Sequence, residues 1–235
     1  MNDYDLQLRW ADLDALNHVN NVRYVDYALE ATGQLIADGI HSADLTITRI
    51  DVDFLRPMML SLKPIRVSSV VSGGQIVQEI CAGDAVFARV TTDFGTRTSR
   101  AVDGHEGAVY PAQLRRSDFD SSTGVMTPAK LFELFQECRL LYFAELMRAN
   151  VAEGYLVAKI VADFHQPVIW RPQPWPITSW VSKVGNSSIG ICAQIADGDT
   201  VLAYYDTVLV CFDLETQKSR ALTGGEKARL RASLS

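Results

Sequence analysis

Two carboxylates, one imidazole and three amides fall within ten consecutive residues near the start of the chain. In order they are Asp12, Asp14, Asn17, His18, Asn20 and Asn21. A carboxylate near an imidazole can act as a nucleophile or as a general base, while the imidazole orients it or polarises the reacting group. The sequence therefore makes Asp14 and His18 the first candidates for catalysis.

A predicted helix over residues 20–38 follows these residues directly. Apolar side chains recur along it at the spacing of one helical face, at Tyr24, Tyr27, Ala28, Ala31 and Leu35. Asn20 or Asn21 can cap the helix, and Gly39 stands where it should end. The first turn of a helix presents unpaired N–H groups and partial positive charge. The N–H groups near Asn21 and Val22 therefore suit a developing oxyanion.

This stretch resembles the acyl-CoA thioesterases of the hotdog fold. The 4-hydroxybenzoyl-CoA thioesterase-like group and the plant acyl-ACP thioesterases share versions of the pattern D-x-D, H-V-N-N, tyrosine and helical glutamate. The matching residues are Asp12, Asp14, His18, Val19, Asn20, Asn21, Tyr24 and Glu30. The chain departs at Asn17, where many relatives have glycine, and at Leu16, where the plant enzymes have a working asparagine.

The resemblance implies roles for these residues. Asp14 would attack a thioester carbonyl or activate water to do so, with His18 assisting. A thioester has a good leaving group, so a carboxylate can serve without a serine triad. Substrate or oxyanion positioning would fall to Asn20, Asn21, Val22 and Tyr24.

Two other acidic residues of the motif are expected to be structural. Asp12 would hold the loop or pair with Arg9 or Arg23, and Glu30 would be a buried, hydrogen-bonded carboxylate. A zinc site on Asp12, Asp14 and His18 has no fourth ligand nearby in the sequence, because the other histidines are scattered. We expect no metal and no cofactor beyond the CoA of the substrate.

Composition excludes several classes of protein. The formal net charge is −6 and neither half of the chain is basic, so nucleic acid is not an expected partner. The four cysteines are far apart without a C-x-x-C motif, which indicates reduced thiols in a cytoplasmic protein. No apolar run has the length of a membrane-spanning helix, and no signal peptide is expected.

The first half of the chain predicts one helix and five strands. A strand over residues 4–10 precedes the helix, and alternating residues predict another over 44–55. Three more are expected over 65–71, 76–82 and 85–92, with glycine turns between them. We expect the last four strands to form an antiparallel meander.

The second half of the sequence repeats this order of predicted helix and strands. Residues 117–120 align with 11–14, and residues 160–167 align without a gap with 50–57. A second helix begins at Pro128, and its predicted buried stripe is Leu131, Leu134, Phe135, Cys138, Leu141 and Tyr142. The sequence thus predicts an α+β protein of two tandem hotdog units, each a long helix wrapped by a five-stranded antiparallel sheet. We place them at residues 1–96 and 113–235, with residues 97–112 as a linker.

The second copy of the site has diverged. Asp120 is kept, but no histidine follows it in the corresponding loop. We expect one active centre in the first unit, walled by the second unit in an intramolecular pseudo-dimer that could oligomerise further. His165 is a second-unit candidate for that shared surface, or else simply a paired histidine at a strand end.

The sequence therefore predicts a cytoplasmic acyl-CoA thioesterase of lipid metabolism. One alternative is an acyl-ACP thioesterase, which the acidic surface disfavours because the carrier protein is itself acidic. A hotdog hydratase is a second alternative, but its motif resembles D-x-N-P-x-H, which differs in spacing and in its proline. The third alternative is a non-catalytic acyl-CoA-binding protein, because the motif around Asp120 has already lost its histidine.

Overall fold

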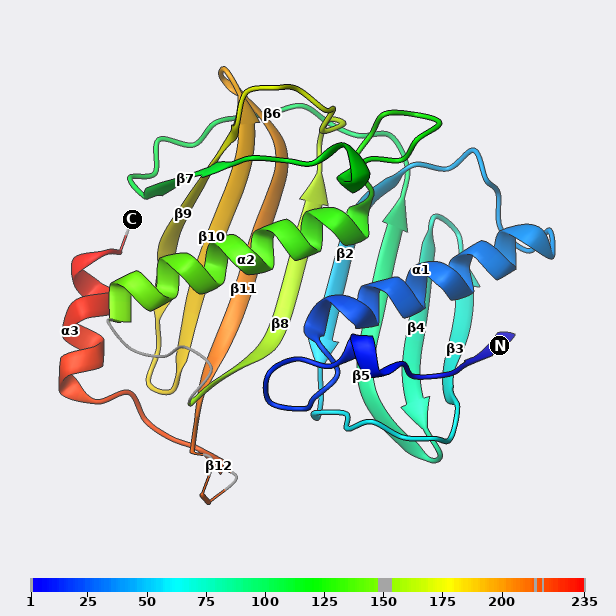
Figure 1. Ribbon diagram of the computed structural model, residues 1–235, viewed down its shortest axis with the longest axis horizontal. Helices are drawn as coiled ribbons and strands as arrows, with labels where there is room; N and C mark the ends of the chain where they lie inside the picture. The colour runs from blue at the N-terminus through cyan, green and yellow to red at the C-terminus, as the bar shows by residue number, and fades with distance from the viewer. Residues whose placement is uncertain (1, 148–153, 214, 217, 235) are drawn as a thin grey trace. The chain divides into compact units, whose positions relative to one another are not determined.

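A computed structural model describes residues 2–147, 154–213, 215–216 and 218–234. The chain divides into two compact units, residues 1–97 and 98–235 (Figure 1). Each unit combines helix with antiparallel strands, so the predicted α+β class is confirmed. None of the described helices is long and apolar enough to cross a membrane.

The first unit holds one long helix and five strands. Its strands lie in the order β1-β3-β4-β5-β2, and each neighbouring pair is antiparallel. The elements are β1 (Asn2–Leu6), α1 (Asn21–Ala37), β2 (Ile47–Phe54), β3 (Ile65–Ser72), β4 (Gln75–Ala82) and β5 (Ala85–Phe94). The helix and all five strands were predicted from the sequence, with shifts at their ends.

The predicted meander is wrong in one pairing. Strands β3, β4 and β5 follow one another through tight turns, with Gly73 and Gly83 in the left-handed region at φ +58° and +59°. Strand β2 instead pairs with β5, on the side away from β3. Residues 55–64 between β2 and β3 contain two prolines and make no tight turn, so nothing forces these two strands to be neighbours.

Strand β1 is shorter than predicted. Its pairing with β3 ends at Leu6, which faces Ile65. The next residue on the β3 side is Pro64, which has no N–H to donate to a ladder. Gln7 instead donates its side-chain amide to the carbonyl of Leu62 at 3.0 Å.

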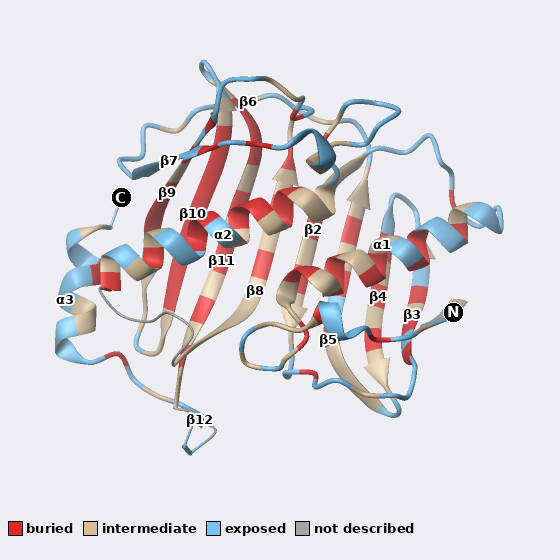
Figure 2. Ribbon diagram, viewed as in Figure 1, coloured by how far each residue is buried: buried red, intermediate tan, exposed pale blue. Residues whose placement is uncertain are grey.

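The core of the first unit lies between α1 and the sheet. All five residues of the predicted stripe on α1 are buried, from Tyr24 to Leu35. They meet alternate residues of the strands, such as Val67, Ile80 and Val90. Figure 2 shows the buried positions recurring along α1 and alternating along the strands beneath it.

The second unit contains a second helix-and-sheet layer. Its main strands lie in the order β8-β11-β10-β9-β7, again antiparallel, while β6 and β12 pair with β11. The strands are β6 (Arg100–Ala101), β7 (Ala108–Ala112), β8 (Tyr155–Phe164), β9 (Trp175–Val184), β10 (Ser188–Asp197), β11 (Thr200–Asp213) and β12 (Lys218–Ser219). The helices are α2 (Pro128–Met147) and α3 (Gly224–Ala232).

Much of the segment predicted to be a linker, residues 97–112, is structured in the second unit. Strand β7 pairs with β9 along its whole length. Gly107 just before it approaches β9 so closely that a Cβ atom there would lie 2.5 Å from the carbonyl oxygen of Ser179. The small residues that gave this segment its low hydrophobicity therefore permit close backbone pairing.

The buried face of α2 differs from the predicted stripe at its C-terminal half. Leu141 is 47% exposed, whereas Arg139 and Phe143 are buried. Phe143 packs with Val181 and Leu209 in an apolar cluster against the sheet. The apolar pattern of the sequence did not reveal Arg139 because a charged residue on the buried face breaks it.

Candidate active site

A tight loop holds the Asp14 carboxylate in place. Its Oδ1 atom accepts hydrogen bonds from the backbone N–H groups of Leu16 at 2.8 Å and His18 at 3.0 Å. The Asp14 N–H in turn donates to the His18 carbonyl at 2.8 Å. Asp14 is half-buried, and its Oδ2 atom has no hydrogen-bond partner among the described residues. One oxygen is thus anchored and the other is available for chemistry.

The loop turns at Asn17, which has a left-handed backbone conformation with φ 60°. Residues other than glycine rarely adopt this backbone conformation, although asparagine tolerates it better than most. The departure from the glycine of many related sequences therefore keeps the same backbone path. Its N–H donates to the Asp14 carbonyl at 3.1 Å, which closes the turn.

This conformation gives a test of the loop. Replacing Asn17 with alanine should lower the free energy of unfolding by about 1 kcal/mol, because alanine resists the left-handed region. Glycine at the same position should change it by less than about 0.5 kcal/mol. Urea unfolding of both variants measures the difference, and equal stability of the alanine and glycine variants would contradict the loop geometry.

Asp12 holds the start of the loop, which is the first of the two structural roles predicted for it. Its Oδ2 atom accepts the Arg9 N–H at 2.8 Å, and its carbonyl accepts the Asn20 N–H at 2.8 Å. The Tyr27 hydroxyl of α1 is buried beside this carboxylate. Burial and the nearby Asp12 charge raise the pKa of Tyr27. Asp12 thereby links the loop to the start of the helix.

The N-terminus of α1 lies directly after the loop. Asn20 is the cap, because its side-chain oxygen accepts the Val22 N–H at 3.1 Å. Its carbonyl accepts the Arg23 N–H at 2.9 Å. The Asn21 N–H has no hydrogen-bond partner in the part of the chain that the structure describes. Of the two N–H groups considered from the sequence, that of Val22 is therefore engaged, while that of Asn21 is available.

Tyr24 lies within the core and close enough to Asp14 to be influenced by it. Its ring packs edge-on against Phe54 with the ring centroids 5.4 Å apart. Burial raises the pKa of the Tyr24 hydroxyl to about 12, the Asp14 charge adds to the rise, and a hydrogen bond with the Met58 backbone opposes it. The hydroxyl is therefore neutral at ordinary pH and can donate a proton in a hydrogen bond.

His18 is tied to the loop through its backbone. Its N–H and carbonyl bond to Asp14, and the residue forms a bridge with Met59. The structure thus joins Asp14 and His18 through the backbone of His18, while the assisting role of its imidazole stays a prediction. Glu30 differs from expectation: it is exposed and accepts only a long 3.4 Å hydrogen bond from Tyr4. It lies at a helical position that faces solvent, so it needs no buried partner.

The second unit contains the same local framework. The Arg115 N–H donates to Asp118 at 2.7 Å, as the Arg9 N–H donates to Asp12. Asp120 occupies the place of Asp14, since its N–H donates to the Val125 carbonyl at 2.9 Å. Val125 therefore stands where the first unit has His18, and the loop between the paired residues is one residue longer.

Asp120 is bound differently from Asp14. Its Oδ1 atom accepts four hydrogen bonds, from the N–H and hydroxyl groups of Ser122 and Thr123, at 2.5 to 3.0 Å. These bonds lower the pKa of the exposed Asp120 carboxyl to about 2, with the Ser122 hydroxyl the largest contributor. A carboxylate stabilised in this way is a weaker base than an ordinary aspartate.

His165, the other second-unit candidate, is paired with its own unit. Its Nδ1 atom lies 2.9 Å from the Thr98 carbonyl, just after β8. Its backbone N–H donates to Leu202 at 2.8 Å. These contacts agree with the alternative of a paired histidine at a strand end.

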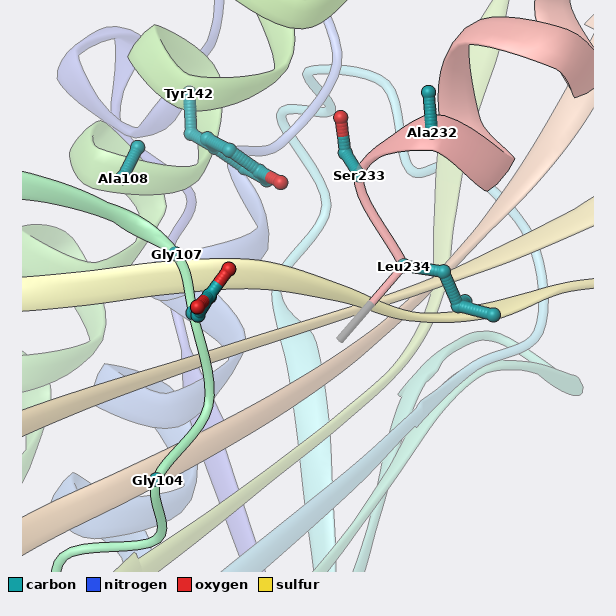
Figure 3. A pocket seen from close by; sticks show the side chains of 8 residues that line it. Gly104, Gly107, Ala108, Tyr142, Ala232, Ser233 and Leu234 are labelled. Atoms are coloured by element: carbon teal, nitrogen blue, oxygen red, sulfur yellow. The ribbon is translucent and has the colours of Figure 1, made fainter.

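The second unit also has an open pocket of about 610 Å³. Figure 3 shows it between the start of β7, Tyr142 of α2 and the C-terminal end of α3. None of the candidate residues lines it. Among the described residues, no three His, Cys, Asp or Glu side chains gather closely enough to hold a metal ion.

Comparisons with known proteins agree with the motif. Residues 1–63, about a quarter of the chain, match the family model of the acyl-ACP thioesterase C-terminal domain. No curated protein matches the sequence. The matched residues include the whole motif from Asp12 to Glu30, so this family match confirms the resemblance inferred from it.

Solved structures with similar folds are thioesterases at low sequence identity. A protein from Lactobacillus plantarum, described as an oleoyl thioesterase, has a TM-score of 0.70 and 10% identity over 90% of this chain and 96% of its own. The 12:0-ACP thioesterase from Umbellularia californica has a TM-score of 0.65 and 10% identity over 94% and 97%. An acyl-ACP thioesterase from Bacteroides thetaiotaomicron has a TM-score of 0.63 and 11% identity over 88% and 97%. At such identities the likeness establishes the fold.

Proposed function

We propose that this protein hydrolyses an acyl thioester, using Asp14 as its catalytic carboxylate. The observation that carries the proposal is the Asp14 side chain itself. One oxygen is fixed by two backbone N–H groups, while the other has no partner among the described residues. The family match of residues 1–63 and the thioesterase folds support the reaction class.

The Oδ2 atom of Asp14 would do the chemistry. It either attacks the thioester carbonyl carbon, forming an anhydride that water then cleaves, or removes a proton from water that attacks the same carbon. In both routes the carbon–sulfur bond breaks, the acyl group leaves as the free acid and the sulfur leaves as a thiol. Fixing Oδ1 holds the reactive oxygen in one orientation, which saves the cost of positioning it during the reaction.

The N-terminus of α1 would stabilise the negative charge that develops on the carbonyl oxygen. The Asn21 N–H is the donor we assign to this role, because the Val22 N–H already donates to the Asn20 cap. The partial positive charge of the helix end favours the same oxyanion. Asn20 thus positions the helix end, and the side chain of Val22 is part of the core.

His18 and Tyr24 would assist. His18 lies four residues after Asp14 and is joined to it by backbone hydrogen bonds, and its imidazole would polarise the carbonyl or protonate the leaving sulfur. Tyr24 is buried and stays neutral at ordinary pH, so it suits the wall of the site and can donate a hydrogen bond there.

The carrier of the acyl group is CoA or acyl carrier protein. The sequence motif led us to acyl-CoA, but the family matched by residues 1–63 and two of the similar folds are acyl-ACP thioesterases. Both carriers present the same thioester to the site. The tandem hotdog form, its pseudo-dimeric packing and the single centre in the first unit are also parts of this proposal, supported by the repeated loop framework.

Thiol release measures this activity directly. Acyl-CoA and acyl-ACP panels of increasing chain length, followed by a thiol reagent, should show turnover of at least one series. The series with the higher kcat/KM identifies the carrier. If acyl-CoA binds by calorimetry but no thiol appears with either carrier, the protein is instead a non-catalytic acyl-binding protein.

A further inference from the structure

The helix-and-sheet core of the second unit contains a charged residue that has no countercharge among the described residues. Arg139 of α2 is only 5% exposed, and it lies one helical turn after Phe135, whose ring stacks on Tyr205 of the sheet. Its guanidinium makes no hydrogen bond or ion pair with any described residue, and its Nε atom is fully buried. An arginine remains protonated in proteins, so a positive charge lies unpaired within this core.

Three hydroxyl groups on the facing strands also have no hydrogen-bond partner in the part of the chain that the structure describes. They belong to Tyr205 and Thr207 of β11 and to Ser179 of β9, each 2% exposed or less. Tyr205 packs against the Phe135 ring of α2, so its side of the sheet faces the helix. Thr207 lies two residues further along β11, and Ser179 lies in register with Tyr205 through Ala193. All three hydroxyls therefore share the face that Arg139 covers.

The first unit fills the same position with a neutral amide instead of leaving it to a cation. There Gln78 of β4 fills the centre and donates to the Ala28 carbonyl at 2.9 Å and to the Ser69 hydroxyl at 3.3 Å. Ser69 faces Gln78 across the ladder as Ser179 faces Ala193 in the second unit. The second unit therefore has Ala193 at the position where the first unit has the hydrogen-bonding amide of Gln78.

The helix has changed at the same place. Thr32 of α1 donates its hydroxyl to Ala28 within the first unit. Arg139 occupies the equivalent position of α2, counted from the residue that precedes each helix. The two changes together remove neutral hydrogen-bonding groups and introduce a cation. Among the described residues the first unit also has unpartnered atoms here, Gln78 Oε1 and the Thr92 hydroxyl, so the buried cation is what distinguishes the second unit.

We propose that the core of the second unit binds the carboxylate group of a small apolar acid, with Arg139 as its countercharge. A guanidinium presents two parallel N–H groups to the two oxygens of a carboxylate. The Tyr205, Thr207 and Ser179 hydroxyls would donate to the remaining acceptor positions. This site is separate from Asp14 and does not depend on thioester hydrolysis.

The surroundings favour an apolar acid over an inorganic ion. Phe132 and Phe135 lie on one side of the site, around Tyr205, and the apolar cluster of Phe143 lies on the other. Tyr142, three residues after Arg139, lines the open pocket of Figure 3, although Arg139 itself does not. A hydrocarbon chain would meet apolar side chains while its carboxylate meets the only buried cation of α2 within the described residues.

Calorimetric titration of the full chain tests the site. Sodium acetate and sodium octanoate are the probes, with sodium chloride at equal ionic strength as the blank. Wild type should bind octanoate saturably, and the Arg139→Met variant, which keeps an unbranched apolar side chain without the charge, should bind at least tenfold more weakly. The Lys130→Met variant removes a half-exposed cation from the same helix and should bind as wild type does.

Thermal unfolding provides the second measurement. Without a carboxylate present, Arg139→Met and Thr207→Val should unfold at the wild-type temperature or above, because each removes an unsatisfied buried group. Octanoate should raise the melting temperature of wild type but not of Arg139→Met. No saturable octanoate binding to wild type, equal binding to both proteins, or an equal effect of chloride would each overturn the proposal.

Discussion

Replacing Asp14 with asparagine should lower kcat for thioester hydrolysis by roughly 10²-fold or more, the scale expected when a positioned base or nucleophile is removed. Asparagine keeps the size of the side chain and an oxygen that can accept the Leu16 and His18 N–H groups. It lacks the charge and basicity that the reactive oxygen needs. The fold should therefore survive while turnover is lost, as steady-state thiol release can measure.

The Asp120→Asn variant is the matched control. Asp120 occupies the same position in the repeated loop, but it is exposed and has four hydrogen bonds on one oxygen. Its replacement should change kcat by less than about twofold, because we assign no chemistry to the second loop. Wild-type turnover in Asp14→Asn would refute the role of Asp14, and a large loss in Asp120→Asn would refute the single centre.

Replacing Gln78 with alanine should lower the free energy of unfolding by about 3 kcal/mol. The side chain is fully buried, so truncation leaves a cavity and removes hydrogen bonds to the Ala28 carbonyl and the Ser69 hydroxyl. These groups tie α1 to the sheet of the first unit. Denaturant unfolding, with an unchanged m-value, measures the loss.

Thr92 supplies the control for this prediction. It is equally buried, but its hydroxyl has no partner among the described residues. Thr92→Val keeps its shape and removes an unsatisfied group, so the free energy of unfolding should fall by less than about 1 kcal/mol or should rise. If Gln78→Ala were as well tolerated as Thr92→Val, the hydrogen bonds of Gln78 would contribute little to stability.

Much of the fold was predictable because its local signals agree with one another. The helix α1 has an apolar stripe, an asparagine cap and a terminal glycine, and the structure places all of them as expected. The turns at Gly73 and Gly83 likewise follow from residues that accept left-handed backbone. The pairing of β2 with β5 could not be predicted, because it depends on contacts between strands that no local pattern specifies.

The sequence motif named the candidate residues of the site, but it could not predict their hydrogen bonds. The motif identified Asp14, and the structure adds that one of its oxygens is anchored. The sequence did not decide whether Asn20 or Asn21 caps α1. The structure assigns the cap to Asn20 by its backbone conformation. Arg139 was missed because its charge interrupts the apolar pattern used to find the buried face of α2.

The extra residue in the second loop limits how that unit could be engineered. Changing Val125 to histidine would supply an imidazole at the position of His18, yet Asp120 would keep its hydrogen bonds to Ser122 and Thr123. A designer seeking a protein with two working centres would have to graft the whole shorter loop, cap included. A single substitution at Val125 therefore cannot reproduce the geometry of the first loop, because the length of the loop and the bonding of its carboxylate differ as well.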